Sequence, residues 1–341
     1  MKTKFILIIL LTIAILVSSL SCSDADEVNQ MVGTIQRLGD ENDERIIGAL
    51  HRVEYGDNVA YIFGTSHASR DGWFPLSDVV VDALRRSDVL YVEIEEAGMG
   101  ETVFIQTVTG RSHLPNNLTW LEFLPEDVYS HLVETLAKWQ LTSRQNLAYD
   151  RINTMNPMSL LSQLENEYII GISEVNVSFE DAVDTHIINL AREMGLPIYG
   201  LESSEQQLEI LFNPPFEVMT ARIMSFMPPE EFSERSGRAP FDELLNAYEN
   251  NDFDSVRKNM ATDMRVDNHC LFATYFIEIV TSFRSTYYAY EIIRLLQETK
   301  NPTTFFVAVG LGHVVMSGGG EEFTDIIQQL ELAGFTVISR W

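Results

Sequence analysis

The sequence predicts an α/β fold, with a mixed, largely parallel central sheet flanked by helices and a large helical insertion. Three segments support this prediction: 59–95 reads strand–helix–strand, 182–205 reads helix–strand, and 303–309 is an uninterrupted β-type run. A strand, a helix and a second strand within about 35 residues have the size of a βαβ unit. Because its right-handed crossover makes the two strands parallel, we expect several strands to end at one edge of the sheet. In open α/β sheets that edge is where ligands bind.

The first part of the chain contains the expected start of the sheet. Residues 46–55 and 59–63, on either side of a Gly-Asp-Asn turn at 56–58, predict a hairpin that leads into the first core strand. Ser77 is a typical N-cap residue, and the apolar residues after it share one face of a short helix. Residues 89–95 then form the second strand of the unit.

The rest of the chain alternates helical and β-type patterns. Residues 121–138 predict an amphipathic helix, and residues 168–179 are β-like or irregular. Residues 205–296 form a long helical stretch broken by prolines and glycines, which we expect to build a cap or wall as an insertion. A final helix at 321–332 and a last strand at 336–339 close the domain.

Composition limits the possible partners. The chain has 341 residues, 45% of them hydrophobic, and a formal net charge of −27. Such an acidic protein is unsuited to binding nucleic acid or an anionic membrane surface. Nucleic acid is therefore not an expected partner. A peptide or small-molecule substrate is expected instead, on the basis of the candidate site residues given below.

The amino terminus has the pattern of an export signal. Residues 1–22 combine a basic start, an apolar core too short to span a bilayer, and small residues before Cys22. This is similar to a bacterial lipoprotein signal, in which the cysteine carries the lipid that anchors the protein to a membrane. Ser19 stands where that signal usually has Leu, so ordinary secretory cleavage to a soluble secreted or periplasmic protein is the alternative. Residues 23–43 predict a flexible tether, and residues 44–341 form the folded domain.

Glu93 is unusual because it lies inside a β-type run. Strands of a parallel sheet are buried on both faces, and a buried carboxylate is costly unless it is paired, protonated or bound to a metal. A simpler interpretation is that the strand ends at Val92 and that Glu93 faces water.

Four predicted strands lead into polar residues suited to catalysis: His67, Glu93, Glu202 and His313. Two of them, His67 and His313, complete Gly-x-x-His sequences at 64–67 and 310–313. Two imidazoles and a carboxylate are a common set for holding a divalent metal. Nucleophile-elbow, His-Glu-x-x-His, P-loop and dinucleotide-binding motifs are not found.

The remaining histidines and Cys270 are weaker candidates for site residues. His186 begins a helix and could also face the site. The others are expected in loops, on exposed helix faces or as inert residues rather than as ligands: His51, His113, His131, His269 and Cys270.

The blocks FGTSH, SDVLYVEIE, VDTHIINLAREMGLPIYGLESSEQQL and FFVAVGLGHVV, in this order, resemble the TraB/PrgY/GumN family. That family is related to the Tiki ectodomains and more distantly to ChaN and erythromycin-esterase-type (EreA) proteins. The resemblance implies an EreA/ChaN-like fold and a Tiki-like metal site at His67, Glu93 and His313.

The resemblance also implies roles for residues outside the proposed metal site. The family's Gly-Val-Asp block matches Val183-Asp184, with Ala182 in place of Gly, and its Leu-Glu…Gln block matches Leu201-Glu202 and Gln207. A family Arg-Asn pair matches Arg284 and Ser285, with Ser in place of Asn.

Two functional hypotheses follow. The first is an exported, lipid-anchored, metal-dependent hydrolase acting on peptides, in which His67, His313 and Glu93 hold Mn, Co, Zn or Fe. Glu202 or Asp184 would support the ligands or act as base, and Arg284 would stabilise a developing oxyanion. The second is a non-catalytic lipoprotein that binds a peptide or a haem-like ligand in the same cleft.

Overall fold

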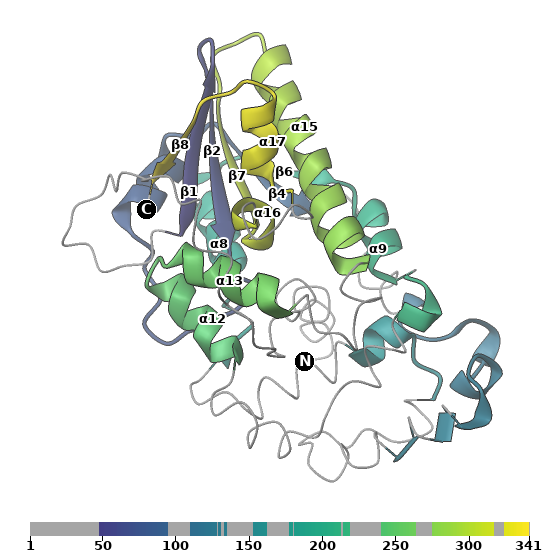
Figure 1. Cartoon of the computed structure of the whole chain (residues 1–341). Coiled ribbons are helices and arrows are strands. Elements are labelled where there is room, and N and C mark those ends of the chain that lie inside the picture. Colours follow the sequence, from purple (N-terminus) through teal and green to yellow (C-terminus); the bar gives the residue numbers. More distant parts are fainter. Residues whose placement is uncertain are drawn as a thin grey trace.

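The computed structural model describes residues 48–94, 110–127, 129–130, 133–134, 153–161, 177–179, 181–212, 214–218, 240–263, 275–316 and 324–340. Within these ranges the core is a six-stranded sheet of order β6-β4-β7-β2-β1-β8 (Figure 1). Its strands are β6 (Ile198–Glu202), β4 (Val89–Ile94), β7 (Thr304–Gly310), β2 (Asn58–Thr65), β1 (Ala49–Tyr55) and β8 (Val337–Arg340).

Four neighbouring strands, β6, β4, β7 and β2, run parallel, whereas β1 is antiparallel to both β2 and β8. The predicted mixed, largely parallel sheet is therefore confirmed. The predicted β1–β2 hairpin is also present, and it turns at Gly56, whose φ of 58° favours glycine.

The first unit forms as predicted, but its two strands are not neighbours. Helix α2 (Asp78–Arg85) follows Ser77 and buries Val80 and Leu84. Strand β7 lies between β2 and β4 and pairs in parallel with both.

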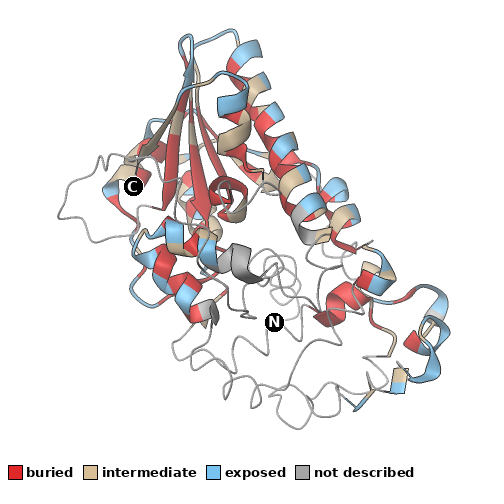
Figure 2. Ribbon diagram, in the orientation of Figure 1, coloured by how far each residue is buried: buried red, intermediate tan, exposed pale blue. Residues whose placement is uncertain are grey.

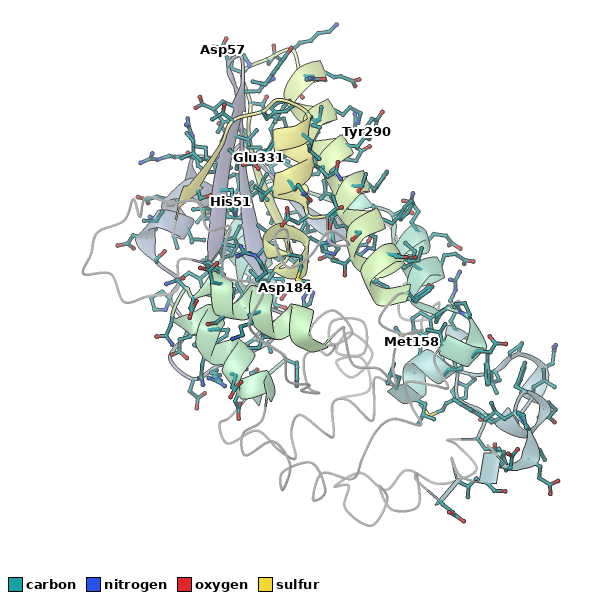
Figure 3. All side chains as sticks on the ribbon, viewed as in Figure 1. His51, Asp57, Met158, Asp184, Tyr290 and Glu331 are labelled. Carbon is teal, nitrogen blue, oxygen red and sulfur yellow. The ribbon has the colours of Figure 1, made fainter. Side chains whose placement is uncertain are left out.

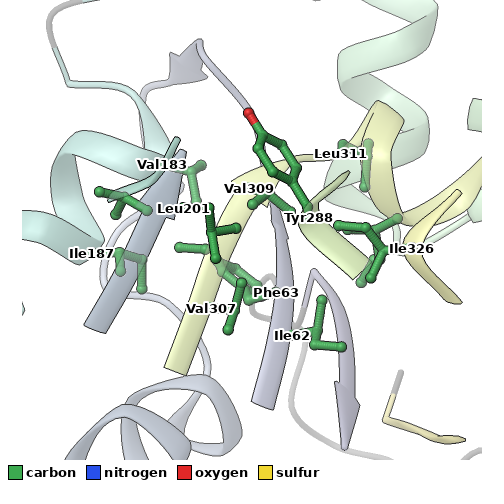
Figure 4. Close-up of a cluster of buried hydrophobic side chains, with 14 of the residues drawn as sticks. Ile62, Phe63, Val183, Ile187, Leu201, Tyr288, Val307, Val309, Leu311 and Ile326 are labelled. Carbon is green, nitrogen blue, oxygen red and sulfur yellow. The ribbon is translucent and has the colours of Figure 1, made fainter. Parts of the chain in front are cut away.

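Helices cover both faces of the sheet. Helix α8 (Val183–Met194) lies behind the sheet in Figure 1, whereas α15 (Arg284–Glu298) and α17 (Ile326–Leu332) lie in front. Figure 4 shows the apolar side chains that fill both layers, including Ile187 of α8 and Tyr288 of α15. Burial is highest along the strands and on the inward helix faces (Figure 2).

The described part of the expected helical insertion is helical, with α9 (Ser204–Phe212), α12 (Pro240–Glu249), α13 (Phe253–Asp263) and the π-helix η4 (Phe276–Phe283). Helices α12 and α13 lie beyond the carboxyl end of the parallel strands (Figure 1). The insertion is shorter than predicted, however, because α15 packs its buried side chains directly on the sheet.

Small elements border the core. Strands β3 (Ser69–Arg70) and β5 (Val177–Ser178) pair with each other, and helix α16 (Gly312–Val315) follows β7. The 3-10 helix η2 (Pro115–Asn117) precedes the predicted 121–138 helix and η3 (Trp120–Glu122) overlaps its start. The described residues 126–127, 129–130 and 133–134 within that range are helical.

Several predictions fall outside the described residues: the export signal at 1–22, the tether at 23–43, His131, His269 and Cys270. Among the described residues, no helix is long and apolar enough to cross a membrane. The prediction for His51 was wrong, because this residue lies in β1 and is only 2% exposed.

Candidate functional site

The structure brings the polar residues at the strand ends together. His67 follows β2 by two residues, Glu93 lies in β4, Glu202 ends β6, and His313 lies in α16 directly after β7. Asp184, in the first turn of α8, lies at the same end of the sheet (Figure 3). The parallel strands therefore converge on one polar cluster, as the topology requires.

Glu93 belongs to the strand. Strand β4 continues to Ile94, so the interpretation that it ends at Val92 is wrong. The β4–β7 pairing stops at Val92 and Ala308, and the Gly310 N–H donates to the Glu93 Oε1 at 2.7 Å. The carboxylate thus takes the place of a backbone acceptor where the two strands separate.

Arg284, the first residue of α15, is the main partner of the two glutamates. Its Nη2 lies 2.6 Å from both the Glu93 Oε2 and the Glu202 Oε1, and its Nε donates to the Glu202 Oε1 at 3.1 Å. Arg284 is 3% exposed. Burial raises the pKa of Glu93, but the Arg284 charge and the Gly310 N–H overcome this effect and hold that pKa well below its usual range.

Tyr288 and Gln207 complete the surroundings of Glu202. The Tyr288 hydroxyl donates to the Glu202 Oε1 at 2.7 Å, and the Gln207 Nε2 donates to Glu202 at 3.2 Å and to Glu93 at 3.3 Å. The Glu202 side chain is only 2% exposed. Its carboxylate is therefore committed to holding Arg284, which makes it a poor candidate for a general base.

His67 is oriented by Asp184. The His67 Nδ1 lies 3.1 Å from the Asp184 Oδ2, and the Val183 N–H donates to the Ser66 carbonyl, which ties the start of α8 to the loop after β2. Burial lowers the pKa of His67, but the Asp184 and Glu93 carboxylates outweigh burial, and the net effect is a raised pKa. With its Nδ1 on Asp184, His67 has its Nε2 free for a ligand.

His313 is held by Ser285. The Ser285 Oγ lies 2.9 Å from the His313 Nδ1, and the Arg284 Nη1 lies 3.4 Å from the His313 Nε2. A guanidinium can only donate, so this geometry assigns the proton of the neutral ring to Nδ1 and a lone pair to Nε2. Burial, reinforced by the Arg284 charge, lowers the pKa of His313 to about 3 and keeps the ring neutral.

The glycines of the two Gly-x-x-His sequences have different roles. A Cβ added to Gly64 would lie 2.8 Å from the Leu311 Cδ1, so Gly64 permits close packing. A Cβ added to Gly310 would lie 3.1 Å from the Glu93 Oε1 and 3.2 Å from the His67 Nε2. The absence of a side chain at Gly310 therefore keeps open the point where these two donors meet.

The donor set suits a divalent metal ion in kind. Both imidazoles use Nδ1 for a protein partner, as metal-binding histidines do, but the His313 Nε2 faces the Arg284 Nη1 at 3.4 Å. The His313 Nε2 and the Glu93 Oε1 are 3.9 Å apart, compared with roughly 3.4 Å for two ligands of one tetrahedral ion. As the side chains stand, no three His, Cys, Asp or Glu residues in the described ranges are grouped closely enough to hold a metal.

Some candidates lie elsewhere, and some partners were missed. His186 stacks on Phe74 with ring centroids 4.1 Å apart, away from the polar cluster's own contacts. Sequence reasoning did not find Tyr288 as a partner of Glu202 or the contact of Ser285 with His313. The spacing of Tyr288 from Arg284, four residues along the same helix, was an available signal.

The comparisons with known proteins place this site in a family. No curated protein and no solved structure matches the chain. The family model described as TraB/PrgY/gumN family matches residues 49–338, which include every residue of the cluster. The chain therefore belongs to the TraB/PrgY/gumN family.

Proposed function

We propose that the protein is a metal-dependent hydrolase that acts on peptides. His67, His313 and Glu93 would hold one divalent ion, Mn, Co, Zn or Fe. The observation that carries the proposal is that both histidines fix Nδ1 on a partner and leave Nε2 facing the Glu93 carboxylate. When bound, such an ion would supply Lewis-acid activation of water or a carbonyl.

The chain's own residues would have separate roles. Asp184 would orient His67, and Ser285 would orient His313. Arg284, fixed by Glu202 and Tyr288, would place a permanent positive charge beside the reacting group, where an oxyanion develops during hydrolysis. Since Glu202 is fully engaged with Arg284, we assign it to positioning rather than to proton transfer.

The direct test is metal analysis of the full chain purified without chelator, followed by a broad peptide-cleavage screen. We expect near-stoichiometric metal in the wild type and its loss in His67→Ala and His313→Ala. His113→Ala is the matched control, because it also removes a histidine, but from an exposed position outside the cluster. Wild-type metal content in both site variants would refute the proposal.

The second candidate is a protein that binds a peptide or a haem-like ligand without catalysis. The close contact of Arg284 with Glu93 and with the His313 Nε2 favours it, because the guanidinium already neutralises the donors. A metal-free protein that binds peptide or haem and cleaves nothing would support this alternative.

We also propose export and lipid anchoring through Cys22, which rest on the pattern of residues 1–22. Cys22→Ala should move the protein from the membrane fraction to a soluble exported fraction. Membrane association that persists in Cys22→Ala would exclude the lipid anchor.

A further inference from the structure

Thr65, the last residue of β2, has a buried hydroxyl to which the site described above assigns no role. The residue is 2% exposed, and its Oγ1 has no hydrogen-bond partner among the described residues. The adjacent polar groups are satisfied: the Thr65 carbonyl accepts from the Leu311 N–H at 2.8 Å, and the Ser66 Oγ donates to the Ala68 carbonyl at 2.8 Å. A hydroxyl buried without a partner destabilises a fold, so its presence calls for a reason.

The register of the sheet places the Thr65 side chain on the face of the sheet that borders the metal-donor cluster. Thr65 pairs with Gly310 in the parallel β2–β7 ladder. Paired residues of neighbouring strands have their Cβ atoms on the same face. A Cβ added to Gly310 would point toward the Glu93 Oε1 and the His67 Nε2. The Thr65 side chain therefore lies on the same face of the sheet as these two donor atoms.

A second polar atom near His67 also lacks a partner. The Asp184 Oδ2 binds the His67 ring, but its Oδ1 is buried and has no hydrogen bond among the described residues. Other buried atoms without partners, such as the Ser77 and Ser159 hydroxyls, belong to segments outside the cluster. Two buried oxygen atoms therefore lack partners, one on the strand that leads to His67 and one on the carboxylate that holds its ring, and together they indicate a polar ligand there.

Packing alone does not explain Thr65. Valine has nearly the same shape and would fill the position without an unsatisfied hydroxyl. The hydroxyl can both donate and accept one hydrogen bond, which suits a ligand oxygen rather than a fixed backbone group.

We propose that the Thr65 hydroxyl is a further ligand-contacting group of this site. It would hydrogen-bond an oxygen atom, of water or of a substrate carbonyl, that shares the ion with His67 and Glu93. This inference rests on the proposed metal-dependent function.

The test compares Thr65→Val, which removes only the hydroxyl, with Thr65→Ser, which keeps it, in the full chain. Thr304→Val makes the same change at the opposite end of the neighbouring strand and serves as the control. The probe is Co²⁺, added to metal-free protein, with affinity measured by titration and stability by melting temperature.

Without metal, Thr65→Val should melt about 1–4 °C higher than wild type, because an unsatisfied buried group is removed. Its Co²⁺ affinity should fall about tenfold or more, as for other groups that contact ion ligands. Thr65→Ser should keep the wild-type affinity, and so should Thr304→Val.

Two results would overturn the inference alone. One is a wild type that binds Co²⁺ with Thr65→Val binding it equally well. The other is a lower melting temperature for metal-free Thr65→Val, which would show that the hydroxyl already has a partner in the protein. A wild type that binds none of Co²⁺, Mn²⁺ or Zn²⁺ would instead refute the proposed function, and the inference with it.

Discussion

Gly310→Ala offers a test of the site that leaves every charged side chain in place. The alanine Cβ would lie 3.1 Å from the Glu93 Oε1, 3.2 Å from the His67 Nε2 and 3.8 Å from the His313 Cδ2. A single methyl group would therefore stand between the donors that we propose to share an ion.

The expected effect on stability is small. The φ of Gly310 lies outside the region that favours glycine, so alanine restricts the unfolded chain and gains about 0.4–1 kcal/mol. Overpacking of a tight site costs about 1–3 kcal/mol. The net destabilisation should not exceed about 2–3 kcal/mol, and the protein should still unfold cooperatively.

The expected effect on metal binding is much larger. Since the methyl group separates Glu93 from His67, the Co²⁺ affinity should fall by more than the roughly 100-fold that loss of an outer partner causes. Thermal unfolding with and without Co²⁺ measures both quantities in one assay. Gly110→Ala is the control, because an added Cβ there has no atom within 4 Å.

The reasoning would be refuted if Gly310→Ala bound Co²⁺ as tightly as wild type, since no ion could then lie where Glu93 and His67 meet. Complete unfolding of Gly310→Ala would also contradict it, because the cost worked out above is only a part of the stability of an ordinary domain.

Three further predictions concern single contacts. Burial lowers the pKa of His51 from 6.5 to about 3. Between these two pH values the unfolded chain is protonated at His51 and the folded protein is not, so the free energy of unfolding falls as the pH falls from 6.5 toward 3. His51→Gln should reduce that slope by about 1.4 kcal/mol per pH unit in urea unfolding, and an unchanged slope would contradict the assignment. Ser285→Ala should shift the ¹⁵N resonance of the His313 Nδ1, which loses its hydroxyl partner while Arg284 still faces Nε2; an unaltered Nδ1 shift would exclude Ser285 as its partner. Glu202→Gln should lower Co²⁺ affinity about 10–100-fold, because Arg284 would then depend more on Glu93; an affinity equal to wild type would show that Glu202 does not support the site.

Local elements of the fold were predictable because their sequence signals are local. The hairpin of β1 and β2, the helix after Ser77 and strand β7 all combine apolar periodicity with turn or cap residues. The order of the strands was not predictable in this way. Insertion of β7 between β2 and β4 depends on contacts such as the bond from the Thr303 N–H to the Asn58 Oδ1, which joins residues 245 positions apart.

The sequence predicted which residues of the strand ends form the site, but not which of them contact each other. The ends of parallel strands meet at one edge of a sheet, so His67, Glu93, Glu202 and His313 could be grouped from strand boundaries alone. Which of them faces which depends on helix α15, whose Arg284, Ser285 and Tyr288 are buried on the face that packs against the sheet. Ser285 and Tyr288 look like ordinary members of an amphipathic helix until that packing is known.

The pairing explains how the protein keeps Glu93 buried. From the sequence alone this carboxylate is a liability, because nothing nearby in the chain offsets its charge. In the structure Arg284 binds the Glu93 Oε2, the Gly310 N–H binds Oε1, and Glu202 supplies Arg284 with a second carboxylate. An ion at the Oε1 side could leave the Arg284–Glu202 pair intact, although the Arg284 Nη1 would have to move away from the His313 Nε2 for that histidine to bind the ion. Two glutamates beside one arginine thus leave carboxylate charge available for a cation, which a single Glu–Arg pair would not.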